Sequence, residues 1–121
     1  MAKWLIRTFT TESGGKPVED WIASLGPGPR STVLSLVGRL EREGVALQKP
    51  FVDHLGGGLW EPRARDGDGI YRVIYFHWKG RTFGLLHGFT KKTRKTPANE
   101  LAIAMARHAT WLARQKRKRD G

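Results

Sequence analysis

The chain has 121 residues and a formal net charge of +11, with five tryptophans, five phenylalanines and 39% hydrophobic residues. This length and composition predict a single domain with its own hydrophobic core and exclude an intrinsically disordered chain. The sequence has no cysteine, which excludes disulfides and thiolate zinc sites. It has neither the apolar segment of a secretory signal at its start nor a run approaching the roughly 20 apolar residues of a membrane span. We therefore expect a cytoplasmic protein.

The positive charge is concentrated in the second half of the chain. Residues 1–60 hold seven Lys/Arg and six Asp/Glu, a net of +1, whereas residues 61–121 hold fifteen and five, a net of +10. An excess confined to one half predicts a basic face rather than an evenly charged, solubilising surface. Nucleic acid is the commonest partner of such a face, and an acidic protein partner is a compatible alternative.

The first half predicts one strand and two helices. Residues 4–9 are rich in aromatic and β-branched side chains, which favours a strand. After a polar loop, Pro17 is suited to a first helical position, and apolar residues recur with helical spacing over 17–25. A second amphipathic helix is expected over 30–43, with Gly44 as its C-cap.

The second half predicts a three-stranded meander and a helix. Residues 59–65, 70–76 and 82–90 have the composition of strands, and they are separated by an Asp-Gly-Asp-Gly turn and a Lys-Gly turn. Thr96 is expected to be the N-cap of a final helix, with Pro97 in its first turn.

This element order indicates an α+β fold. A strand, two helices, a three-stranded meander and a C-terminal helix are expected to form an antiparallel sheet with the helices packed on one side. We expect one domain over residues 1–113. The highly charged residues 114–121 are expected to form a flexible basic tail.

Residues suited to chemistry gather on the meander and directly after it. Because alternate side chains of a strand share a face, Glu61, Arg63 and Arg65 are expected to point the same way. Arg72 lies within an otherwise apolar strand, and His87 lies near the end of the last strand. A run with four cations and no acid follows, comprising Lys91, Lys92, Arg94 and Lys95.

Each of these residues also has an ordinary structural explanation. Arg63 and Arg65 are of a type often found solvated on strands, and Arg72 is well placed for an ion pair with Glu61. His87 can also be a partly buried histidine whose hydrogen bonds are satisfied within the fold. A run of lysines is most often a charged loop. Their joint position at one end of the sheet is what favours a functional site.

The acidic residues do not predict a metal site. Glu61, Asp66 and Asp68 form no obvious inward-facing cluster, and the turn accounts for both aspartates. We expect no metal and no cofactor.

Three stretches carry a resemblance to a known family. They are Leu-Trp-Glu-Pro-Arg at 59–63, Asp-Gly-Ile-Tyr-Arg-Val-Ile-Tyr at 68–75 and, most specific, Leu-Leu-His-Gly-Phe-Thr-Lys-Lys-Thr-Arg-Lys-Thr-Pro at 85–97. In order and spacing they resemble the phage Gp49-like, or HigB-like, branch of the RelE/ParE toxin superfamily, and the match extends over residues 4–107. Pro62 departs from the family pattern, which usually has Leu there. Because proline removes a ladder hydrogen bond, Pro62 predicts a sheet edge or a bulge and leaves the aim of Arg63 open.

The resemblance implies a RelE-like fold and the toxin half of a type II toxin–antitoxin pair. The best-known members of the superfamily enter the ribosomal A site and cut the bound messenger RNA, whereas the ParE branch inhibits DNA gyrase. The partners implied are messenger RNA, the ribosome and a cognate antitoxin, either acidic or of the helix-turn-helix, HigA-like kind.

Metal-free RNA cleavage uses the 2′-hydroxyl as nucleophile and needs a base, an acid and cations around the phosphate. The ordinary pKa of histidine, about 6.5, makes His87 the candidate for proton transfer at neutral pH. Arg63 and Arg72 suit phosphate oxygens, while Lys91 and Lys95 suit the transition-state charge, with one lysine as an alternative acid. These five are the candidate catalytic residues. The candidate RNA-binding residues are Arg65, Lys92, Arg94 and Thr96.

Two other functions remain open from the sequence. A ParE-like gyrase inhibitor needs no cleavage residues, so His87 and Lys95 would be dispensable. A non-catalytic RNA- or DNA-binding module would keep the basic face, but no RRM, KH, zinc-finger or helix-turn-helix pattern is present. We rank the ribosome-linked endoribonuclease first, the gyrase inhibitor second and the binding module third.

Overall fold

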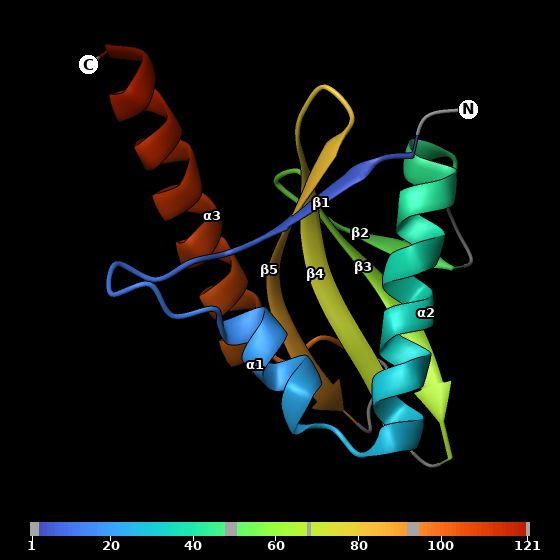
Figure 1. The fold of residues 1–121 in the computed structure, drawn as a ribbon. Coiled ribbons are helices and arrows are strands. Elements are labelled where there is room, and N and C mark those ends of the chain that lie inside the picture. The colour runs from blue at the N-terminus through green and yellow to red at the C-terminus, as the bar shows by residue number, and fades with distance from the viewer. Residues whose placement is uncertain (1–2, 48–50, 68, 92–94, 121) are drawn as a thin grey trace.

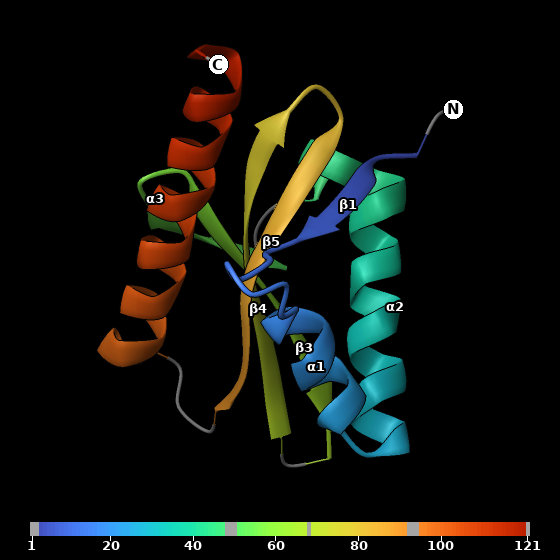
Figure 2. The same cartoon turned by 60° about the vertical axis from the view of Figure 1, so that its left-hand side comes forward.

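The computed structural model describes residues 3–47, 51–67, 69–91 and 95–120. The protein has an α+β fold in which a five-stranded sheet lies between two helical layers (Figures 1 and 2). No helix in the described ranges is long and apolar enough to cross a membrane. The elements are β1 (Leu5–Thr8), α1 (Pro17–Ser24), α2 (Pro27–Glu43), η1 (Gly44–Ala46), β2 (Val52–Gly56), β3 (Leu59–Asp66), β4 (Gly69–Lys79), β5 (Thr82–Lys91) and α3 (Ala98–Asp120).

The strands are arranged in the order β1-β5-β4-β3-β2. The predicted meander is confirmed, because β3, β4 and β5 pair antiparallel in sequence order. The sheet as a whole is mixed, since β1 pairs with β5 in parallel. A fifth strand, β2, was not predicted: it is short, contains Asp53 and His54, and runs directly into a glycine turn, so its sequence is typical of a loop.

The two faces of the sheet carry separate hydrophobic cores. Val73 and Tyr75 of β4 pack with α1 and α2, whereas Ile74 and Phe76 pack on the other face with α3. The prediction that all helices pack on one side is therefore wrong in this respect, and Figure 2 shows α3 across the sheet from α1 and α2. The reason lies in β4, which is apolar on both faces and so needs a cover on each.

Pro62 lies inside the sheet and not at an edge. β3 pairs with β2 on one side and β4 on the other, and Pro62 is opposite Val52 of β2. On the β4 side, Trp60 pairs with Tyr75 and Arg63 pairs with Arg72. Three steps along β3 thus match three steps along β4, so β3 has no bulge towards β4 at Pro62. The expected edge or bulge is therefore wrong, and Arg63 keeps the alternation of its strand.

α3 continues through the segment that was expected to be a flexible tail. The helix extends to Asp120, and two residues beyond position 113 contact the body of the domain. Arg114 donates from Nη1 to the Thr10 carbonyl at 2.5 Å, and Trp78 Nε1 donates to the Gln115 side chain. Residues 114 and 115 thus belong to the folded domain.

Candidate nucleic-acid interface

The sheet register brings most of the candidate residues onto the face covered by α3. Arg63 of β3 lies opposite Arg72 of β4, which lies opposite Phe89 of β5. One step along, Arg65 lies opposite Ile70, which lies opposite Lys91. These two rows are at the end of the sheet where β3 and β5 end and where the chain enters α3 (Figures 1 and 2).

Arg72 is the buried centre of this region. Its side chain is only 2% exposed, and its guanidinium forms an ion pair with the fully buried carboxylate of Glu61. The Thr96 hydroxyl donates to the other Glu61 oxygen at 2.8 Å. The expected ion pair of Arg72 with Glu61 is thus confirmed, and in this structure the guanidinium is almost closed to solvent. Burial lowers the pKa of Arg72, while Glu61 opposes that shift.

Thr96 has a different part from the one expected. Since α3 begins at Ala98, the Thr96 side chain lies before the helix, and its hydroxyl is used in the contact with Glu61. The contact joins the start of α3 to β3. It stabilises the same buried pair and leaves the RNA-binding assignment of Thr96 without support from the geometry.

Arg63 is partly exposed and pairs with Asp53 of β2. The Asp53 carboxylate also lies 3.8 Å from the Arg72 guanidinium, so it is placed beside two cations. Asp53 was missed from the sequence because its strand was missed. An RNA phosphate that binds Arg63 has to compete with this carboxylate.

The remaining candidate cations differ in how much of each residue the structure describes. Arg65 and Lys95 are exposed at this end of the sheet. Lys91 is the last residue of β5 and pairs through its backbone with Ile70, but its side chain lies outside the described part. Lys92 and Arg94 also fall outside the described residues. We call Arg63, Arg65 and Lys95 the basic end of the sheet.

His87 lies between two residues of α3. Its Nδ1 is 3.1 Å from Arg107 Nη1, and its Nε2 is 3.1 Å from Glu100 Oε2. Since a guanidinium can only donate, Nδ1 accepts and Nε2 carries the proton that is donated to Glu100. The ring also stacks on Phe89, with 5.4 Å between centroids. Both nitrogens are therefore occupied, and a role in proton transfer requires one of these contacts to open.

Two histidines make the stability of the fold sensitive to pH. Burial lowers the pKa of His87, an effect that Glu100 opposes and Arg107 reinforces, and burial also lowers the pKa of His108. In the unfolded chain both take protons near their usual pKa of about 6.5. Between the lowered folded pKa and about 6.5 the unfolded state therefore binds more protons than the folded state, so the free energy of unfolding falls as the pH is lowered through this window.

We therefore expect the urea midpoint to be highest above pH 6.5 and to fall as the pH is lowered below that value. His87→Gln removes one of the two groups and is expected to flatten this dependence, as measured by circular dichroism at several pH values. An unchanged profile in the variant would show that His87 does not contribute to it.

The fold and the basic end define a class, namely a strongly basic RelE-like α+β domain. Residues 20–109 match the profile of the phage-derived protein Gp49-like family (DUF891). The match covers most of the chain, so the protein belongs to this family of RelE/HigB-type toxins, and the resemblance found in the sequence is confirmed. Membership indicates the toxin of a toxin–antitoxin pair, with an antitoxin as partner and a broad relation to nucleases. No curated protein matches the sequence closely enough to count as a relative.

Proposed function

We propose that this protein is a metal-independent endoribonuclease of a type II toxin–antitoxin system, which cleaves messenger RNA in the ribosomal A site in the cytoplasm. The observation that carries the proposal is the basic end, where exposed cations from β3 and the entry to α3 gather in a member of a RelE/HigB-type family. The cognate antitoxin, acidic or of the HigA-like helix-turn-helix kind, holds the toxin inactive.

Cation chemistry at the basic end suits RNA. In this scheme the exposed Arg63 and Arg65 bind phosphate oxygens, because their planar guanidinium groups allow bidentate contacts. Lys95 supplies positive charge where negative charge grows on the phosphorus in the transition state. Arg72 does not touch RNA in this scheme. It stabilises the sheet beneath Arg63 through Glu61 and thereby positions the basic end.

Proton transfer is assigned to His87. Glu100 orients the imidazole by accepting a hydrogen bond from the Nε2–H group, so the nitrogen that can act as a base is Nδ1. Arg107 has to release Nδ1 before this nitrogen can take the 2′-hydroxyl proton, and a nearby phosphate is a suitable new partner for its guanidinium. An orienting carboxylate of this kind is common around catalytic histidines.

The proposal is tested by inducing the protein without its antitoxin. We expect growth arrest in which incorporation of amino acids falls before incorporation of thymidine, and in which messenger RNA ends map within codons on ribosomes. The matched control is Lys95→Ala, which removes an exposed cation and is expected to relieve the arrest at equal protein level.

One observation favours a second candidate, the ParE-like gyrase inhibitor. Both nitrogens of His87 are occupied, so the described structure holds its proton-transfer candidate in contacts that also serve a purely structural role. That function predicts that thymidine incorporation stops first and that gyrase–DNA breaks accumulate. Such a result would replace the ribonuclease assignment.

A further inference from the structure

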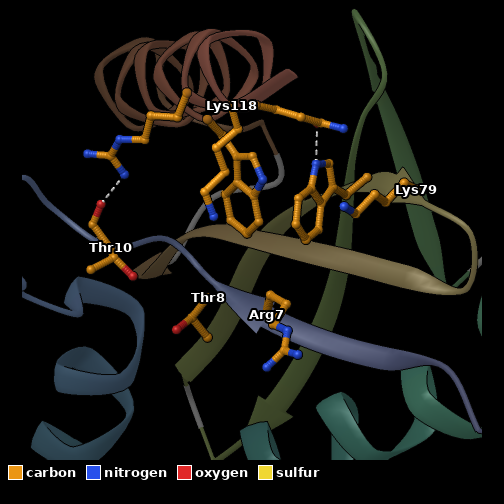
Figure 3. A pocket seen from close by; sticks show the side chains of 9 residues that line it. Arg7, Thr8, Thr10, Lys79 and Lys118 are labelled. Atoms are coloured by element: carbon orange, nitrogen blue, oxygen red, sulfur yellow. Dashed lines mark hydrogen bonds between the residues drawn. The ribbon is translucent and has the colours of Figure 1, made fainter. Parts of the chain in front are cut away.

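A second basic region lies away from the basic end, in a groove of about 650 Å³ between β1, the end of β4 and the last turns of α3 (Figure 3). We call it the α3 groove. Figure 3 shows Arg7 on β1 and Lys118 on α3 at opposite walls, with Lys79 at one end. The residues that matter for the argument are Arg7, Trp78, Lys79, Trp111, Arg114 and Lys118.

The groove is electropositive. Among the side chains that the structure describes, its lining contains four cations and no carboxylate. Within the described residues, Arg7, Lys79 and Lys118 form no ion pair with an acid. Several uncompensated cations around one hollow attract an anion, and the attraction is strongest for a chain that carries several negative charges.

Two indole rings lie between these cations and are held in place. Trp78 and Trp111 meet edge to face with 5.3 Å between ring centroids. Trp78 is anchored by its hydrogen bond to Gln115, and Lys79 Nζ lies 4.3 Å from the centre of the Trp78 ring. Trp111 packs against Phe76 at 5.2 Å. Rings fixed in this way bind a flat partner at little cost in side-chain entropy.

A glycine in β5 keeps the floor of the groove low. Gly84 lies opposite Arg7 in the sheet. A Cβ atom at Gly84 would be 2.4 Å from the Phe76 ring and 3.0 Å from the Trp111 ring. The absent side chain therefore allows Trp111 to lie directly against the strand beside Arg7.

We propose that the α3 groove binds single-stranded nucleic acid, with a base on the indole rings and the flanking phosphates on Arg7 and Lys118. Aromatic platforms bordered by cations are the general means of binding single strands, because every base has a stacking face and every linkage a charge. An acidic peptide would use the cations but would have no need of the two indoles, which are half-buried at the groove. This inference goes beyond the proposed function, since binding here requires no cleavage.

The α3 groove is separate from the basic end. Arg72 and Trp78 lie on the same face of β4 but six positions apart, which corresponds to about 20 Å along a strand. The body of α3 packs on the sheet between them. A strand bound in the groove would therefore be a second point of attachment and would increase overall avidity for a long RNA.

The test uses a fluorescein-labelled oligodeoxyadenylate of eight nucleotides, which lacks the 2′-hydroxyl and cannot be cleaved by the proposed chemistry. Its anisotropy is followed as a function of salt for the full chain and for Arg7→Gln/Lys118→Gln. Each phosphate contact on a single strand contributes about −0.7 to the log–log salt slope, so the variant is expected to lose about 1.4 in slope. Extrapolated from 1 M salt, this corresponds to roughly 25-fold weaker binding at 0.1 M.

The matched control is Lys3→Gln/Arg42→Gln, which removes the same charge from exposed residues near the end of α2. We expect it to leave the slope within about 0.3 of the wild-type value, an allowance well below the 1.4 change above. Equal losses in both double variants would mean that only net charge matters, and the proposal would be wrong.

Base stacking is tested without altering the protein. An abasic oligomer of equal length is expected to bind about 5- to 150-fold more weakly, which is the range for losing one stacked base. If the abasic oligomer or polyglutamate of equal charge binds the wild type as tightly as the DNA, the groove takes an acidic chain and the nucleic-acid assignment falls. Cleavage of messenger RNA is measured separately, so failure here leaves the ribonuclease proposal standing.

Discussion

Arg72→Ala is expected to lower the free energy of unfolding by about 3–5 kcal/mol, because it leaves the carboxylate of Glu61 buried without its cation. A small domain is stable by only about 5–15 kcal/mol, so a large part of the stability depends on this pair. The Thr96 hydroxyl remains as a donor to Glu61 but carries no charge. The change is measured as the shift of the urea midpoint at constant m-value.

Two further variants show whether burial of the unpaired charge is the cause. Arg72→Met combined with Glu61→Leu removes both charges and is expected to recover most of the lost stability. Arg65→Ala, an exposed arginine on the same strand as Glu61, is the control and is expected to change stability by no more than about 0.5 kcal/mol. If the double variant is as unstable as Arg72→Ala, shape and packing at position 72 matter more than charge.

This result also decides how activity data on Arg72 are understood. A loss of cleavage in Arg72→Ala at 37 °C would follow from a smaller folded fraction, without any contact between Arg72 and RNA. Cleavage per folded molecule is therefore the quantity to compare. By contrast, Arg63 and Arg65 are exposed, so their substitution changes RNA binding with little effect on folding.

The strands of the meander were predictable because their signals are local. The Asp-Gly-Asp-Gly sequence after β3 is typical of a two-residue hairpin turn. Gly67 in this turn has a φ of +58°, a conformation that favours glycine. α2 was also expected, although it begins at Pro27, three residues before the predicted start, because Pro27 and Pro29 both lie in a first turn that tolerates proline.

The contacts that shape the site were less predictable because they join segments far apart in the chain. Glu100 and Arg107 reach His87 only because α3 crosses the face opposite α1 and α2, and a helix pattern does not tell which face of a sheet it covers. The Arg72–Glu61 pair was weighed from the sequence, since an arginine within an apolar strand needs a buried partner. The contact of Asp53 with Arg63 could not be predicted, because the strand that contains Asp53, β2, was not predicted.

The five candidate catalytic residues differ in how accessible their side chains are. Of the five candidate catalytic residues, Arg72 is buried and Arg63 is paired with Asp53, while the side chain of Lys91 lies outside the described part. Lys95 is exposed, and His87 is available only after a contact opens. The proposed chemistry consequently depends most on His87 in β5 and Lys95, both of which come before α3 in the chain.

Lys95→Ala and His87→Gln are each expected to reduce ribosome-dependent messenger RNA cleavage by about 10²-fold or more, as for a transition-state cation and a proton-transfer group. Lys95 is exposed, so its removal is expected to leave the urea midpoint nearly unchanged. Glutamine at position 87 keeps a hydrogen-bond donor for Glu100 but does not take up or release a proton at neutral pH, so this variant separates proton transfer from positioning.

Asp53→Asn is expected to change activity in the other direction: it removes the carboxylate that competes for Arg63 and is expected to keep or raise cleavage. Cleavage is measured by primer extension on programmed ribosomes with equal amounts of folded protein. Full activity of His87→Gln would make His87 a structural residue held by Glu100 and Arg107, and full activity of Lys95→Ala as well would remove the acid–base scheme and leave the gyrase inhibitor as the better assignment.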